Sequence, residues 1–124
     1  MENHAGYQIM SSVRDGMIEV TITGEITVNS FENLLNDIDE ILKASGAGKA
    51  LWDVRSLEGR YSCENVYSSA RSYTKRYYDI HNAIVDLPMN ADFVSLNEPR
   101  VVNAGVSLKC FTDIDAARSW LKSK

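Results

Sequence analysis

Residues that cross-link a chain or anchor it in a membrane are scarce in this sequence. It has only two cysteines, Cys63 and Cys110, too few for a disulfide framework and without the cysteine or histidine spacing of a structural zinc site. No apolar run reaches the ~18 to 20 residues that span a bilayer, and residues 1–4 lack the basic and apolar regions of a secretory signal. We therefore expect a cytoplasmic protein with reduced thiols and no membrane span.

Positive charge is also limited. The 124 residues include 13 Lys and Arg against 17 Asp and Glu, a net charge of -4. Nucleic-acid binding needs a clustered excess of Lys and Arg, so we expect no nucleic-acid partner. The chain lacks a glycine-rich loop that could cradle phosphates, and neither His4 nor His81 has a nucleophile at motif spacing. These absences predict a protein that is not an enzyme and needs no cofactor.

The residues that are present favour one α/β domain covering residues 1–124. A hydrophobic content of 44% is typical of a folded globular chain rather than a disordered one. An Asp-Gly pair between the strand-like residues 7–13 and 17–24 predicts a β-hairpin. Residues 31–42 then repeat apolar side chains at helical spacing, and Gly46 suits the end of that helix.

Three short apolar strands follow, at residues 50–54, 83–86 and 106–113, and each leads into an aspartate. Helices are predicted over residues 63–78, over about 97–105, and over 114–121. The order ββαβαβαβα predicts a mixed, largely parallel sheet that the antiparallel hairpin opens.

The strands at residues 51–55 and 83–86 and the closing residues 110–121 also carry a family resemblance. The closing run contains F-x-D, ending at Asp113, and A-x-x-W-L, ending at Leu121. The chain resembles the SpoIIAA-like fold, and more narrowly the bacterial single-domain group labelled STAS/SEC14-like. The resemblance implies a small α/β regulatory module that binds a protein partner or a small ligand. Lipid-binding relatives have a pocket larger than a chain of this length readily encloses.

Anti-sigma factor antagonists of this fold carry Asp-Ser-Ser-Gly at the start of the second helix, and phosphorylation of a serine there switches their partners. The matching stretch after Asp53 is Tyr61-Ser62-Cys63-Glu64, which keeps one serine and loses the motif. Ser62 with the nearby Arg60 stays a candidate phosphorylation or anion site, because a helix N-terminus favours phosphate. The alternative is that Ser62 only caps the helix.

Tyrosines and basic residues gather along the predicted second helix. Tyr and Arg dominate binding hot spots, so this helix holds a candidate interface or ligand surface made of Tyr61, Tyr67, Arg71, Lys75 and Tyr78. Tyr73 and Tyr77 share the apolar stripe and are expected to pack against the sheet. A second copy of the chain is another possible partner for the exposed helix face.

The strand-end aspartates Asp53, Asp86 and Asp113 support a rival hypothesis. The carboxyl ends of parallel strands meet at one edge of the sheet, and carboxylates suit Mg²⁺, so the three could serve a metal-dependent phosphoryl-transfer enzyme. The alternative is structural. Asp113 or Thr112 would then cap the last helix, and Asp53 would pair with Arg55 or a loop amide.

Overall fold

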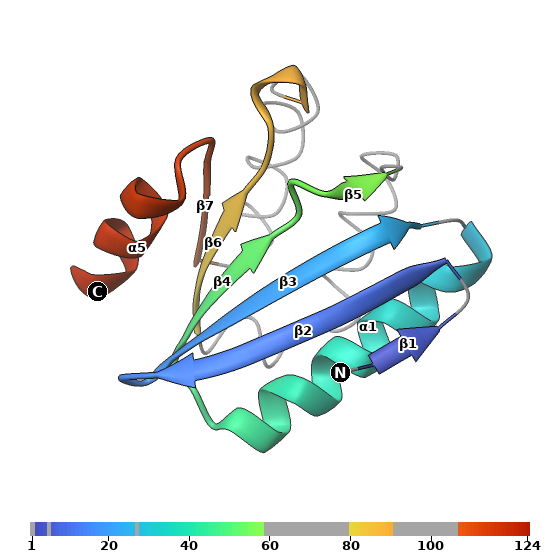
Figure 1. Ribbon diagram of the computed structural model, residues 1–124. Coiled ribbons are helices and arrows are strands. Elements are labelled where there is room, and N and C mark those ends of the chain that lie inside the picture. The colour runs from blue at the N-terminus through green and yellow to red at the C-terminus, as the bar shows by residue number, and fades with distance from the viewer. Residues whose placement is uncertain (1, 5, 27, 59–79, 91–106) are drawn as a thin grey trace.

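The computed structural model describes residues 2–4, 6–26, 28–58, 80–90 and 107–124 (Figure 1). These residues form one sheet of seven strands in the order β1-β2-β3-β4-β6-β7, with β5 pairing with β3. The strands are β1 (Glu2–His4), β2 (Tyr7–Arg14), β3 (Met17–Glu25), β4 (Lys49–Asp53), β5 (Leu57–Glu58), β6 (His81–Val85) and β7 (Ser107–Phe111). The helices are α1 (Val28–Ser45), the 3-10 turn η1 (Pro88–Asn90) and α5 (Ile114–Lys122).

The sheet is mixed, as the sequence predicts. Strands β1, β2 and β3 pair in antiparallel fashion, whereas β3, β4, β6 and β7 run parallel to one another. The β2–β3 turn lies at Asp15 and Gly16, whose φ angles of 54° and 77° are those that a two-residue hairpin needs. The short strands β1 and β5 were not predicted, and the helices predicted over 63–78 and 97–105 lie outside the described residues.

The first face of the sheet packs against α1. Alternate residues of β3, among them Ile18 and Val20, are buried here together with Trp52 of β4. They meet the apolar stripe of α1, of which Leu34 and Ile38 are buried. The helix ends as predicted, because Gly46 adopts a φ of 63° and donates its N–H to the carbonyl of Leu42.

The opposite face packs against α5, which lies beside β6 and β7 (Figure 1). Ala117 and Leu121 of this helix are fully buried against residues such as Leu51 of β4 and Ala83 of β6. Within the described ranges, neither helix has the length and hydropathy of a membrane span.

Candidate functional site

The surface predicted on the second helix cannot be placed. Its candidate residues, Tyr61, Tyr67, Arg71, Lys75 and Tyr78, lie outside the described residues, and so does the candidate anion site of Ser62 and Arg60. Both remain predictions from the sequence.

Asp53, the first strand-end aspartate, forms an ion pair with Arg55. This pairing is one of the structural alternatives to metal binding that the sequence suggests. Arg55 donates Nε to Asp53 Oδ1 at 2.9 Å and Nη2 to Asp53 Oδ2 at 2.8 Å, and its backbone N–H donates to Oδ1 at 3.2 Å. The hydrogen bond from the guanidinium lowers the pKa of the Asp53 carboxyl from its ordinary 3.8, although partial burial opposes this effect. Asp53 is therefore held ionised and oriented by a neighbour in its own loop.

The other two strand-end aspartates also hydrogen-bond to backbone amides nearby. Asp86 is only 3% exposed, and its Oδ1 accepts a hydrogen bond from the N–H of Leu87 at 2.8 Å. Asp113 is the N-cap of α5, where its Oδ1 accepts from the N–H of Asp115 at 3.2 Å. Of the two caps that the sequence predicts, Asp113 and Thr112, the structure has Asp113.

These contacts bear on the metal hypothesis. Across the part of the chain that the structure describes, which includes Asp53, Asp86 and Asp113, no three Asp, Glu, His or Cys side chains are grouped so that they could hold a metal ion. Each aspartate instead helps a strand pass into the loop or helix that follows it. The described residues therefore give the metal hypothesis no support.

An ion pair that the sequence did not predict joins α5 to β3. Arg118 donates Nε to Glu19 Oε2 at 2.8 Å and Nη2 to Glu19 Oε1 at 2.9 Å, and its Nη1 lies 3.6 Å from Asp115 Oδ1. The hydrogen bond from Arg118 lowers the pKa of Glu19 from its ordinary 4.5. A carboxylate held ionised in this way is a poor proton donor near neutral pH.

The core holds a second polar contact that was not predicted. Asn82 on β6 is 1% exposed, and its Oδ1 accepts a hydrogen bond from Trp52 Nε1 on β4 at 2.9 Å. Its Nδ2 donates to the carbonyl oxygens of Ser107 at 3.2 Å and Ile80 at 3.4 Å. Because each of these groups has a partner, Asn82 connects three adjacent strands and is a structural residue.

Two solved structures resemble this arrangement over nearly their whole length. An anti-sigma factor antagonist from Mycobacterium paratuberculosis is 14% identical, with a TM-score of 0.69 over 98% of this chain and 99% of that one. An uncharacterized protein with a SpoIIAA-like fold from Shewanella loihica PV-4 is 19% identical, with a TM-score of 0.58 over 98% of each chain. No protein-family model and no curated protein matches the sequence. The chain therefore has the SpoIIAA-like fold, and the resemblance predicted from its closing segment is confirmed.

Proposed function

We propose that this chain is a cytoplasmic regulatory module that binds another protein and catalyses no reaction. One observation carries the proposal: the chain shares its fold with an anti-sigma factor antagonist over nearly the full length of both proteins. Antagonists of that kind act by binding a protein, and this favours a protein partner over a small ligand.

The described carboxylates support a non-catalytic role. A metal-dependent phosphoryl-transfer reaction would need them to converge on one ion. Asp53 instead pairs with Arg55, and Glu19 pairs with Arg118. Side chains that are neutralised in pairs stabilise loops and helix packing, and they are not poised for acid, base or ligand chemistry.

We place the partner-binding surface on the sequence that follows β5, where the tyrosines and basic residues gather. Its proposed members are Tyr61, Tyr67, Arg71, Lys75 and Tyr78. Aromatic and guanidinium side chains supply large contact areas and directional hydrogen bonds, which suits a protein interface. Because the Asp-Ser-Ser-Gly motif is missing, we infer that partner exchange does not depend on it.

The proposal is tested by affinity purification of the tagged chain from its native cells with quantitative mass spectrometry. A protein that co-purifies with the wild type should fall at least about tenfold in the variant Tyr67→Ala/Arg71→Glu, the loss expected from removing one hot spot. Lys124→Glu, a charge reversal at an exposed residue elsewhere, serves as the matched control and should retain the partner. Direct binding is then measured by calorimetry with the purified partner.

Two results would contradict the proposal. One is that no protein is enriched over a mock purification at any expression level. The other is that Tyr67→Ala/Arg71→Glu and Lys124→Glu retain the partner equally, which would place the contact elsewhere on the chain.

Ser62 is a second candidate site. We propose that a phosphate on Ser62 would be received by Arg60 and would change partner affinity. Ser62→Glu should then alter the dissociation constant, whereas Ser62→Ala should leave it near the wild-type value. Equal affinities for all three proteins would reduce Ser62 to a helix cap.

A further inference from the structure

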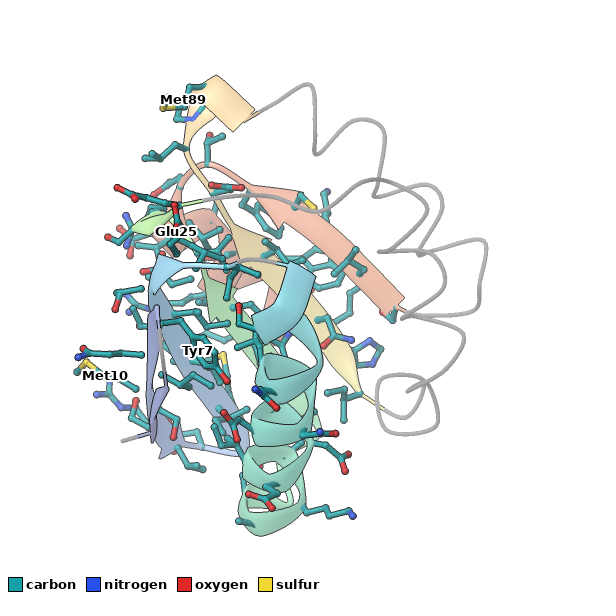
Figure 2. The ribbon with its side chains drawn as sticks, turned by 90° about the vertical axis from the view of Figure 1, so that its right-hand side faces the viewer. Tyr7, Met10, Glu25 and Met89 are labelled. Carbon is teal, nitrogen blue, oxygen red and sulfur yellow. The ribbon has the colours of Figure 1, made fainter. Side chains whose placement is uncertain are left out.

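The turn that follows β6 exposes apolar side chains beyond the carboxyl ends of the parallel strands. Leu87 is 36% exposed and Met89, in η1, is 82% exposed, and Figure 2 shows Met89 at the outer tip of this turn. The described residues have only two other large hydrophobic side chains that are exposed, Met10 and Val13 on β2. Exposed apolar side chains that gather in one place, rather than singly, are typical of interaction sites.

The turn is held in place by hydrogen bonds to the neighbouring strands. The N–H of Asp86 donates to the carbonyl of Phe111 at 3.0 Å, and the N–H of Leu87 donates to Asp86 Oδ1 at 2.8 Å. The carbonyl of Val85, just before them, accepts from the N–H of Val54 at 3.0 Å. An apolar tip that is ordered before contact loses less conformational entropy on binding, so it suits an anchor for a partner.

Carboxylates stand at the same end of the sheet. Glu25, the last residue of β3, pairs in register with Glu58 of β5, and both are exposed. Like charges directly opposite one another on neighbouring strands destabilise a sheet, and no ion pair within the described ranges involves either residue. The exposed Asp113 follows the carboxyl end of β7, and Arg55, which also lies at this end, is already paired with Asp53.

This negative charge decides which occupant fits the apolar tip. The same edge of a second copy would bring carboxylates against carboxylates, and an anionic membrane surface would repel them as well. A protein surface with an apolar pocket and a rim of Lys or Arg side chains matches both the tip and the charges around it.

We propose that the protein partner covers this end of the sheet, with an apolar pocket that takes Met89 and Leu87 and with basic side chains that pair with Glu25 and Glu58. This contact rests on the function proposed above, because the same partner makes it. Only β4 lies between β3 and β6, so the two strand ends fall within one interface of ordinary size. The tyrosine-rich sequence begins at Tyr61, three residues after Glu58, and the two contacts are continuous along the chain.

Calorimetry tests the apolar contact, with the purified protein that co-purifies with the wild type. Met89→Ala should raise the dissociation constant at least about tenfold, the loss expected from removing one hot spot. Met10→Ala is the matched control, because Met10 is also an exposed methionine, at 55%, but lies on β2. It should leave the dissociation constant unchanged.

Glu58→Gln separates a binding role from a structural one. Removing one of two opposed charges should raise the urea midpoint of the free chain, because the repulsion with Glu25 is relieved. It should also raise the dissociation constant about threefold and make binding less sensitive to salt. Glu40→Gln, at an exposed carboxylate on α1, is the matched control and should change neither the affinity nor its salt dependence.

The outcomes separate this contact from the proposed function. If Met89→Ala and Glu58→Gln bind the partner like the wild type while Tyr67→Ala/Arg71→Glu does not, the contact proposed here is wrong and the proposed function stands. If no partner is found, both are wrong. Loss of affinity in Met89→Ala alone would refute the basic rim. Binding of the wild type, but not of Met89→Ala, to phosphatidylserine vesicles would overturn the proposal by assigning the tip to a membrane, and self-association that Met89→Ala abolishes would overturn it in favour of a second copy.

Discussion

Arg118 on α5 donates two hydrogen bonds, of 2.8 and 2.9 Å, to the carboxylate of Glu19 on β3, a residue 99 positions away in the sequence. The same helix buries Ala117 and Leu121 on that face of the sheet. The ion pair therefore joins the helix to β3, beside the apolar stripe that packs on β4 and β6.

A double-mutant cycle on Glu19→Gln and Arg118→Met should give a coupling free energy of about 0.5–1 kcal/mol, because the pair is bidentate but only half-buried. Urea unfolding of the four proteins provides the measurement. The exposed pair of Lys43 and Asp39, 3.4 Å apart on α1, is the comparison and should couple by only about 0.3 kcal/mol. Strict additivity of the Glu19 and Arg118 variants would show that the contact does not contribute to stability.

Stability should fall in acid because of two carboxylates with lowered pKa values. Hydrogen bonds from arginine lower the pKa of Glu19 from 4.5 and that of Asp53 from 3.8 in the folded chain. The unfolded chain therefore takes up these protons at a higher pH than the folded chain. Their contribution to the free energy of unfolding is complete above about pH 5 and is lost as the pH falls through 4.5 and 3.8 and then through the lowered folded values.

Urea unfolding at several pH values checks this expectation. The variant Glu19→Gln/Asp53→Asn has no carboxylate at either position, so its stability should depend less on pH between about 5 and 3 than that of the wild type. If the two curves run parallel over this range, other carboxylates govern the acid sensitivity.

Asn82→Ala should destabilise the fold by about 2–3 kcal/mol, because it removes the buried acceptor of Trp52 Nε1 and the donor to the Ser107 carbonyl. The same substitution should cost about 1 kcal/mol less in a Trp52→Phe background, where the indole donor is already gone. Chemical denaturation followed by circular dichroism avoids interference from the lost fluorophore. An equal cost in both backgrounds would mean that the Trp52–Asn82 bond adds nothing.

Gly24→Ala should be among the most damaging glycine substitutions, at roughly 2–4 kcal/mol. Gly24 has a φ of +95°, and a Cβ here would meet the carbonyl oxygen of Gly6 and lie 2.8 Å from the Cα of Tyr7. Gly16→Ala shares the positive φ but meets nothing within 4 Å, so it should cost only about 1–2 kcal/mol. Gly48→Ala, with neither constraint, should be nearly neutral, and thermal unfolding will rank the three.

Local signals in the sequence predicted much of the fold. The Asp-Gly pair marked the β2–β3 turn, Gly46 marked the end of α1, and Asp113 marked the start of α5. Each signal reflects a conformational preference that acts within a few residues, such as a positive φ or a side chain that accepts a backbone N–H. Such preferences are readable without knowledge of the tertiary structure.

The ion pairs of the described carboxylates were harder to predict from the sequence. Asp53 and Arg55 are two positions apart, so their pairing could be foreseen, whereas Glu19 and Arg118 come together only after several strands have been added to the sheet. Asn82 has the same character, since its partners lie on β4 and β7. The short strands β1 and β5 carry no periodic pattern of their own and depend on the longer strands beside them.

The placement of α5 also bears on how the chain matures during synthesis. The β2–β3 hairpin and α1 can form from neighbouring residues as soon as they leave the ribosome. The second core cluster is completed later. Ala117 and Leu121 can pack against Met17, Leu51 and Ala83 only after Leu121 has been synthesised. Until then the strand residues of this second cluster lack the cover of α5, and a chaperone that recognises apolar strands would have its best opportunity to bind in that interval.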